Sequence, residues 1–431
     1  MSHRPDAVVF ADSAECVSKV MKFACRHRIP VTVRGAGVGY VGGCVPLHGG
    51  IVLSLARMKR ILHLNAEEGV AIVEPGVITG DLQDAARRVG MFYPPDPASL
   101  RECSIGGNIA TNAGGPRCLK YGVTRPYVLG LEVVLPTGEI IHVGGRTHKN
   151  KTGFDLVGMF VGSEGLLGTV TKATLRLIPH PPSRACVSAG FRDERAAAAA
   201  AVKILSSGFL PSALEIADRF TLDAARKSFQ SQADKKSFAT FLQGKSHLLI
   251  ELDGHTRSVA GESRQLAALL RRNDAFSIEL AIGDRACEQL WGLRREFSYS
   301  LKKMGLRKMN EDIAVPRTRL VDLFAFTRKL SKRHKLLVAS FGHAGDGNIH
   351  VNIMLDANDP AQVKRSAKAL DELFRQVVKW GGAITGEHGI GIAKKRWWPL
   401  AVGVRERRLN EQLKAMLDPK GILNPGKFVG R

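Results

Sequence analysis

This 431-residue chain lacks the sequence features of a membrane-spanning, a secreted or a nucleic-acid-binding protein. No apolar run approaches the roughly 18–20 residues that a membrane-spanning helix needs. The N-terminus, MSHRPDAVVF, lacks the basic-then-apolar order of a secretory signal peptide. Aromatic residues make up only 6% of the chain, and no nucleic-acid-binding motif accompanies them. We therefore expect a cytoplasmic enzyme without nucleic acid as a partner, and peripheral contact with the inner membrane stays open.

Metal-binding cysteine motifs are also absent. The seven cysteines are scattered and form no CxxC pair that would hold zinc or an iron–sulfur cluster. We expect reduced, structural thiols.

Acidic residues are few compared with basic ones, 40 against 63, which gives a net charge of +23. The basic residues are spread over many helical segments in short runs, a pattern typical of a solvated surface. An acidic partner or an anionic lipid is the alternative interpretation.

The length favours two or three domains. Strands and a helix alternate over residues 7–33, and an alanine-rich helix is expected over Glu194–Leu205 and another helix over Ala361–Trp380. A boundary falls at the proline cluster Pro179–Pro182. The predicted class is α+β. The predicted domains are residues 1–181, residues 182–400, and a C-terminal segment of residues 401–431.

Two histidines flank a turn in the sequence GHAGDGNIH at residues 342–350. The dipeptide Asp346–Gly347 is a strong hairpin signal between two apolar runs. If these two residues form the turn, His343 pairs directly with His350 on the same face of a sheet. Such pairs have Cβ atoms roughly 4.5–5.5 Å apart, close enough to share one divalent ion.

A carboxylate and a third imidazole follow in GEHGIG, residues 386–391. Glu387 is a candidate third metal ligand. A histidine pair followed by Glu-His between glycines favours a metal-assisted acid/base site over structural histidines.

A glycine-rich loop, Arg34–Gly43, follows a strand and satisfies GxGxxG. A Rossmann site needs a helix after this motif, whereas here another strand follows at residues 51–55. We therefore interpret the loop as a nest of backbone amides that wraps a pyrophosphate.

Five motifs follow one another in the first half of the chain: RGAGVGYVGGCVP (34–46), PPDPAS (94–99), IGGNIATNAGG (105–115), KNKTGFDL (149–156) and GSEGLLGTVT (162–171). In this order they resemble the FAD-binding domain of the vanillyl-alcohol oxidase superfamily, also called the PCMH type. The histidine motifs and the terminal NPGK are similar to the branch containing D-lactate dehydrogenase and the glycolate oxidase flavoprotein subunit.

The resemblance implies an FAD-binding domain followed by an α/β substrate domain, with an antiparallel sheet flanked by helices. It also implies noncovalent FAD, because Val38 and Tyr40 stand where covalent members have a histidine in or near the glycine loop. The implied cofactor-binding residues are Arg34, Gly35, Ala36, Gly37, Val38, Gly39, Gly42, Gly43, Pro95, Asp96, Ser104, Gly106, Gly107, Asn108, Asn112, Ser163, Glu164, Gly165 and Asn424.

The reaction-site residues are likewise implied by the resemblance. A divalent ion, zinc or manganese, would be held by His343, His350 and Glu387, with His388 as the base. Arg294 would bind the substrate carboxylate through a planar two-point contact.

The implied reaction is oxidation of a small D-2-hydroxy acid, D-lactate or glycolate, to the 2-keto acid, with hydride transfer to flavin N5. Asn310 falls near a position where relatives that act on a longer dicarboxylate carry a lysine, which favours a monocarboxylate. Lys308 keeps a D-2-hydroxyglutarate-type activity open.

Two other classes stay open: a zinc hydrolase that uses the same ligands, and a non-catalytic flavoprotein subunit of a larger complex. The electron acceptor is not identified by the sequence. It can be oxygen, a quinone, a cytochrome, an electron-transfer flavoprotein or an iron–sulfur subunit. A homodimer is also open.

Overall fold

The computed structural model describes residues 3–228 and 243–429. It divides into two compact units. Unit 1 comprises Met1–Gly115, Gly122–His180 and Glu387–Arg431, and unit 2 comprises Pro116–Tyr121 and Pro181–Gly386. Each unit is described by itself.

Unit 1 begins with a small parallel sheet in the order β1-β3-β2. The helix between its first two strands starts where the Ser13 hydroxyl accepts a hydrogen bond from the amide of Cys16 at 3.2 Å, because a serine at this position satisfies a free amide of the first turn. The alternation expected over residues 7–33 is thus confirmed. The elements are β1 (Ala7–Phe10), α1 (Ala14–His27), β2 (Val31–Arg34) and β3 (Ile51–Ser54).

A second sheet of unit 1 has five antiparallel strands in the order β4-β5-β9-β7-β8. Short helices lie in the long irregular stretch between its strands, and a two-stranded pair joins β6 to β10. The elements are β4 (Ile61–Asn65), β5 (Val70–Val73), α2 (Thr79–Arg88), β6 (Met91–Phe92), α3 (Ile105–Thr111), η1 (Arg125–Tyr127), β7 (Val128–Val134), β8 (Ile140–Gly144), α5 (Leu156–Phe160), β9 (Thr169–Arg176) and β10 (Ile178–Pro179).

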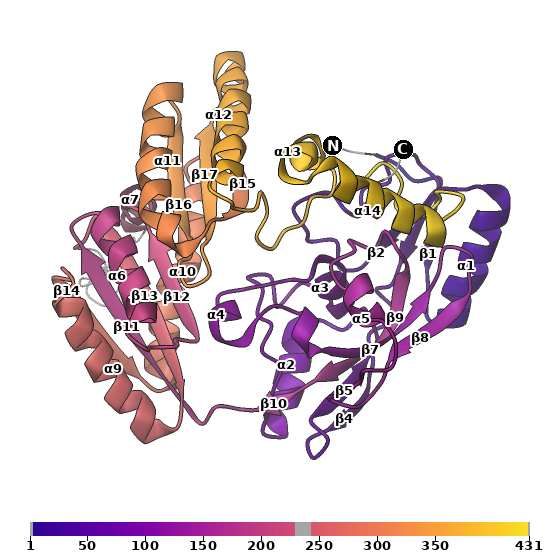
Figure 1. Cartoon of the computed structure of the whole chain (residues 1–431), viewed down its shortest axis with the longest axis horizontal. Helices are drawn as coiled ribbons and strands as arrows, with labels where there is room; N and C mark the ends of the chain where they lie inside the picture. The colour runs from indigo at the N-terminus through magenta and orange to yellow at the C-terminus, as the bar shows by residue number, and fades with distance from the viewer. Residues whose placement is uncertain (1–2, 229–242, 430–431) are drawn as a thin grey trace. The chain divides into compact units, whose positions relative to one another are not determined.

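The C-terminal segment returns to unit 1 from Glu387, whereas the sequence analysis extends the second domain to residue 400. The buried Lys414 ammonium holds this segment by donating to the carbonyls of Leu166 and Leu423, at 2.8 and 2.7 Å. The elements are η3 (Lys395–Trp397), α13 (Trp398–Ala401) and α14 (Val404–Leu417) (Figure 1).

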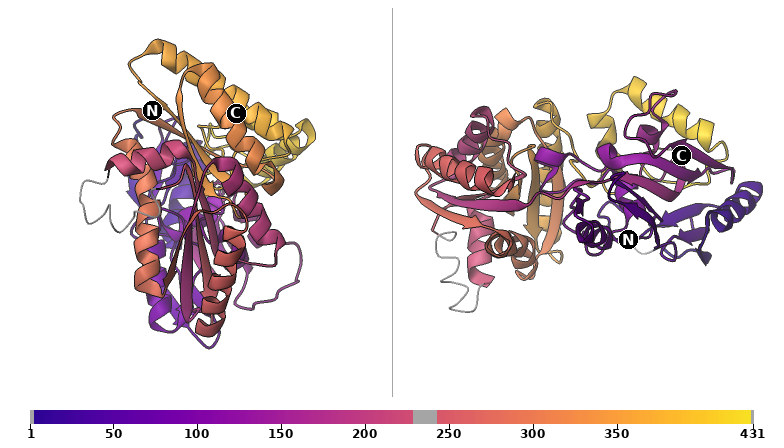
Figure 2. Two further views of the ribbon diagram at one scale, coloured as in Figure 1. Left: turned by 90° about the vertical axis from the view of Figure 1, so that its left-hand side faces the viewer. Right: turned by 90° about the horizontal axis from the view of Figure 1, so that it is seen from below.

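Unit 2 is built on a seven-stranded antiparallel sheet in the order β14-β11-β13-β12-β16-β17-β15. Helices pack on the sheet in two groups, α6, α9, α11 and α12 in one and α7 and α10 in the other (Figure 2). The strands are β11 (Ser183–Phe191), β12 (Ala213–Ala217), β13 (Ser246–Gly254), β14 (Ser277–Ile282), β15 (Arg307–Ala314), β16 (Leu337–His343) and β17 (Asn348–Leu355). The helices are α4 (Cys118–Tyr121), α6 (Glu194–Ser206), α7 (Arg219–Ser228), α9 (Thr256–Arg271), α10 (Asp284–Lys302), η2 (Arg317–Arg319), α11 (Leu320–His334) and α12 (Pro360–Lys379).

The arrangement confirms the predicted α+β class with an antiparallel sheet flanked by helices. The alanine-rich helix and the helix over residues 361–380 are confirmed as α6 and α12. Among the described residues, no helix combines the length and apolar character that crossing a bilayer requires.

Candidate active site

The two motif histidines lie on the neighbouring strands β16 and β17 of unit 2. The predicted direct pairing is wrong: His343 pairs with Asn348, and His350 pairs with Phe341. The turn is therefore the four residues 344–347, not Asp346–Gly347 alone. A shift of two residues keeps every side chain on its original face, because side chains alternate with a period of two. The two imidazoles still share one face, with ring centroids 5.6 Å apart.

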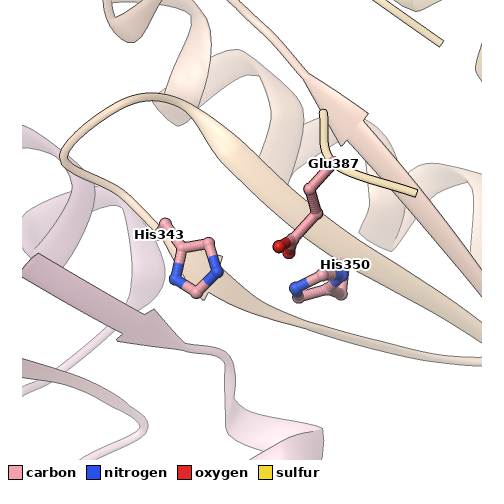
Figure 3. Close-up of side chains that lie close together, drawn as sticks. All are labelled: His343, His350 and Glu387. Carbon is pink, nitrogen blue, oxygen red and sulfur yellow. The ribbon is translucent and has the colours of Figure 1, made fainter. Parts of the chain in front are cut away.

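Three candidate metal ligands converge at this hairpin. The ligand atoms of His343, His350 and Glu387 all lie within 4.8 Å of one another, and their side chains point toward a common centre (Figure 3). Ligand atoms around a tetrahedral zinc ion, with bonds of about 2.1 Å, lie about 3.4 Å apart. The donor set and its spacing therefore fit a divalent ion after a small inward movement.

Glu387 is placed by the residues just before it in the chain. The carboxylate of Asp312 accepts hydrogen bonds from the Thr385 hydroxyl at 2.7 Å and from the Gly386 amide at 3.0 Å. Asp312 is fully buried and pairs across β15 and β17 with His350. These two hydrogen bonds to the Asp312 carboxylate thus fix the start of the GEHGIG segment beside the histidine strand.

A buried glutamate that the sequence analysis missed orients two of the predicted residues. Glu215 on β12 pairs directly with His343. Its carboxylate contacts His343 Nδ1 at 2.5 Å and accepts from Arg294 Nε at 2.6 Å. Burial raises the pKa of Glu215, but the charges of His343 and Arg294 outweigh it and lower the pKa to about 2. A carboxylate on Nδ1 directs Nε2 of the imidazole toward a metal.

Arg294, on α10, has its terminal nitrogens available. Of its guanidinium nitrogens, only Nε donates a hydrogen bond to any described residue. The guanidinium lies over the rings of Phe341 and Phe297, with Cζ 4.9 and 5.6 Å from the ring centroids. The guanidinium is planar, and its two terminal nitrogens present parallel N–H groups that match a carboxylate.

Polar side chains continue along the same face of β15 and β17. Asn310 pairs with Asn352, and the Oδ1 atom of each is buried without a hydrogen-bond partner among the described residues. Lys308 lies two residues further along β15 and donates to Ser298 Oγ at 2.7 Å. Burial lowers the pKa of Lys308 to about 8.

The glycine loop of unit 1 forms an open cradle of backbone amides. Gly37 and Gly42 adopt φ values of 76° and 75°, a backbone conformation that residues with a side chain rarely adopt. In the two described ranges, 3–228 and 243–429, the amides of Gly37, Gly39 and Gly43 donate to no protein acceptor. Amides left open in this way fit a bound pyrophosphate.

Ser104 joins this loop to the N-terminus of α3. Its hydroxyl accepts from the amides of Ala36 and Gly107, at 3.3 and 3.4 Å. A Cβ at Gly35 would lie 2.6 Å from Ser104 Oγ, so only glycine allows this approach.

Most of the predicted cofactor-binding side chains hold loops together. Asn108 donates to Thr79 Oγ1 at 2.6 Å, and Asn112 Oδ1 accepts from the amide of Arg125 at 2.8 Å. Asn424 accepts from the amide of Val33 at 3.0 Å and donates to the carbonyl of Gly165 at 2.7 Å.

Glu164 also holds a loop, because its carboxylate accepts from the amides of Ile390 and Gly391 at 2.7 and 2.8 Å. Asn112, Glu164 and Asn424 all adopt φ values near 50°, at 51°, 51° and 46°. Such strain in non-glycine residues collects at functional sites. Within the cradle, backbone amides are therefore the groups left open for a ligand.

The remaining predicted residues of unit 1 lie beside these. Asp96 is buried, and the carbonyl of Pro95 accepts from Gln83 Nε2 at 2.9 Å. Gly106 packs its backbone against Pro75, and the carbonyl of Ser163 accepts from the amide of Leu166 at 2.9 Å.

His388, the predicted base, lies against the glycine loop. Its ring centroid is 4.9 Å from that of Tyr40. His388 and the cradle thus belong to unit 1, whereas His343, His350 and Arg294 belong to unit 2.

Three buried polar residues near the candidate site were not predicted from the sequence. Glu215 is the one charged residue in the buried strand ALEIA, and Asp312 follows an Asn-Glu pair at the end of a strand. Tyr93 directly precedes the PPDPAS motif, and its hydroxyl is buried without a partner in the described part of the chain. A buried charge or hydroxyl is costly unless it is paired or used.

Sequence comparison identifies the class of protein that this fold and cradle define. Residues 5–144 match the family model FAD binding domain, and residues 180–428 match the model FAD linked oxidases, C-terminal domain. The protein is thus a flavin-dependent oxidoreductase. It belongs to the FAD-linked oxidases, which confirms the resemblance to the vanillyl-alcohol oxidase superfamily.

Named relatives and a solved structure agree with this family. The chain is 36% identical over 431 residues to the glycolate oxidase subunit GlcD of Bacillus subtilis (strain 168), covering 99% of this chain and 89% of that protein. It is 33% identical over 428 residues to the D-lactate dehydrogenase of Anaerostipes hadrus, covering 99% of this chain and 90% of that protein. p-Cresol methylhydroxylase with bound substrate has the same fold, with a TM-score of 0.81 at 20% identity over 100% of this chain and 90% of that chain.

Proposed function

We propose that the protein is an FAD-dependent dehydrogenase that oxidises a small D-2-hydroxy acid, D-lactate or glycolate, to the 2-keto acid. The observation that carries this proposal is the sharing of Glu215 by His343 and Arg294. One carboxylate thereby places a candidate metal ligand and a carboxylate-binding guanidinium side by side. The names of the two relatives, a glycolate oxidase subunit and a D-lactate dehydrogenase, support the same substrate class.

Each residue of the proposed site has a defined task. The two terminal nitrogens of Arg294 bind the substrate carboxylate, and the guanidinium lies over the rings of Phe341 and Phe297. His388 accepts the proton of the 2-hydroxyl, since an imidazole titrates near neutral pH.

FAD would be held noncovalently in the amide cradle, where it supplies a hydride acceptor at N5. Zinc or manganese would be held by His343, His350 and Glu387, where it supplies a positive charge that favours loss of the hydroxyl proton. Glu215 and Asp312 fix His343 and the start of the Glu387 segment before either group binds.

The two compact units suggest a division of labour. In this proposal unit 1, which includes residues 387–431, binds FAD, and unit 2 binds the substrate. The electron acceptor is a quinone, a cytochrome, an electron-transfer flavoprotein or an iron–sulfur subunit. That the B. subtilis relative is named as a subunit supports a separate acceptor protein.

Arg294→Lys tests the substrate-binding task. A lysine keeps the charge but loses the two-point contact, so kcat/KM for D-lactate or glycolate should fall about 100-fold with a small-molecule dye as acceptor. Arg295→Lys is the matched control, because Arg295 is the next residue on α10 and pairs with Glu288 on the surface. Equal losses in both variants would contradict the task assigned to Arg294.

A second candidate is a D-2-hydroxyglutarate-type dehydrogenase. Lys308 and the unpartnered Asn310 and Asn352 oxygens favour it, because they extend a polar strip from His350 along β15 and β17. Comparison of kcat/KM for D-2-hydroxyglutarate, D-lactate and glycolate decides between the two. A tenfold or greater preference for the dicarboxylate would replace the first candidate with the second, since a hydrogen-bonding site discriminates by at least about this factor.

A further inference from the structure

One loop of the chain begins and ends in unit 1 but has its tip in unit 2. Its base is closed where Thr124 donates to the carbonyl of Ala113, from the amide at 3.1 Å and from the hydroxyl at 2.8 Å. The next residue, Arg125, donates its amide to Asn112 Oδ1 at 2.8 Å. Asn112 ends α3, the helix of the proposed FAD cradle. The base of the loop is thus part of the cradle.

The tip, Pro116–Tyr121, is here named the anchor segment. Arg117 donates to both oxygens of Glu251 on β13, at 2.8 and 3.2 Å. The same carboxylate accepts from Trp291 Nε1 at 2.7 Å, from Arg184 at 3.1 Å and from the Ser212 hydroxyl at 3.1 Å. Glu251 is almost completely buried, so this attachment is a firm one.

A second carboxylate of the same strand binds the other end of the anchor segment. Lys120 forms an ion pair with Asp253, and the Tyr121 hydroxyl donates to Asp253 Oδ2 at 2.7 Å. Both ends of the anchor segment are therefore attached to β13.

Between these two attachments, Leu119 packs on the turn of the histidine hairpin. A Cβ at Gly345 would collide with Cδ2 of Leu119, so the leucine occupies the space beside this glycine. Gly345 also donates its amide to the carbonyl of Leu214 at 3.2 Å, next to Glu215. The anchor segment thus touches the turn that joins His343 to the strand of His350.

We propose that the anchor segment is a positioning device that couples FAD binding in the cradle to the order of the His343–His350 hairpin. Only a few residues separate Asn112 from Leu119. Hydrogen bonds close the base of the loop and attach its tip to β13. A ligand that fixes α3 and Asn112 therefore restricts the anchor segment and, through Leu119, the hairpin turn. This inference rests on the proposed role of the cradle in binding FAD. By reciprocity, order in the hairpin would also strengthen FAD binding.

Hydrogen exchange of the full chain, with and without saturating FAD, tests the coupling. No metal or substrate is added, so the result is independent of the proposed 2-hydroxy-acid activity. In the unaltered chain, FAD should slow amide exchange in the hairpin, residues 337–355, by about fivefold or more, as well as in the cradle. In Leu119→Ala the cradle should still be protected, whereas protection of the hairpin by FAD should be lost.

Three further variants make the test specific. Leu119→Met keeps a side chain of similar volume beside Gly345 and should restore the coupling. Lys120→Met removes the ion pair with Asp253 but keeps the hydrogen bond from the Tyr121 hydroxyl. It should weaken the coupling by a second route, which decides the matter if Leu119→Ala does not fold. Lys172→Met removes a surface ion pair with Glu132 in unit 1 and should change nothing.

Two results would overturn the proposal. The first is FAD protection that is confined to the cradle in the unaltered chain. The second is hairpin protection that persists in full in both Leu119→Ala and Lys120→Met.

Discussion

At the scale of single residues, the candidate site depends on charges buried in pairs. Glu215 is 1% exposed and touches both a candidate metal ligand and the candidate substrate-binding arginine. A lone buried carboxylate would be strongly destabilising, so its two partners explain why it can stay ionised.

Glu215→Gln should weaken metal binding. The amide keeps the size of the side chain but removes the charge that orients His343, and loss of such a partner costs about 10–100-fold in metal affinity. Competition with a chromophoric chelator measures the affinity for zinc or manganese. Glu279→Gln, on the edge strand β14, is the control and should bind metal like the unaltered chain. Unchanged affinity in Glu215→Gln would show that His343 is not a ligand.

His247 should make stability depend on pH. It is fully enclosed beside the Ser188 hydroxyl at 2.8 Å, and burial lowers its pKa from 6.5 to about 3. Between these pH values the unfolded chain binds a proton that the folded chain does not, so stability is complete above pH 6.5 and falls as the pH falls. The loss from pH 6.5 to pH 5 should be on the order of 1–2 kcal/mol.

Thermal unfolding midpoints across this pH range measure the effect. His247→Gln should lose the part of the slope that belongs to this histidine. The exposed His142→Gln should keep it. An identical slope in all three proteins would contradict the assignment.

The sequence predicted the site residues with distinctive types and spacing. His343, His350 and Glu387 do lie together, because a histidine pair on a hairpin and a carboxylate between glycines leave few alternatives. Glu215 and Asp312 were not found, since their partners are distant in sequence and only the sheet order brings them near.

At the scale of elements, the hairpin shows which part of a sequence prediction is robust. The turn is two residues longer than predicted. Each histidine still lies on the predicted face of the sheet, because the register differs by an even number of residues. The alternation of apolar residues determines the face. The turn residue Gly345 lies beside Leu119, a neighbour distant in sequence that the hairpin pattern does not reveal.

The glycine cradle predicts a specific loss of FAD. Gly35→Ala would place a methyl group 2.6 Å from Ser104 Oγ and so separate the loop from α3. We expect the Kd for FAD to rise at least about tenfold, a modest cost for a displaced hydrogen-bonded hydroxyl. Flavin fluorescence during titration measures it. Gly261→Ala, in a helix with open space around it, should bind FAD normally; the same Kd for Gly35→Ala would show that this approach is unimportant.

At the scale of the whole molecule, the family match argues against one of the functional classes that the sequence left open. A zinc hydrolase with a merely structural N-terminal half does not agree with an FAD binding domain over residues 5–144. The 63 basic residues are scattered along the chain, and no described helix is long and apolar enough to cross a membrane. The acceptor of the electrons is the part of the function that composition does not specify.

The central claim is that this chain itself removes hydride from a D-2-hydroxy acid. The most direct measurement is the visible absorbance of the protein-bound flavin when D-lactate or glycolate is added without oxygen, before and after treatment with a chelator. At least one of the two acids should bleach the flavin at once, and chelation should slow the bleaching until zinc or manganese is restored. A flavin that stays yellow with D-lactate, glycolate and D-2-hydroxyglutarate, with metal present, would contradict it.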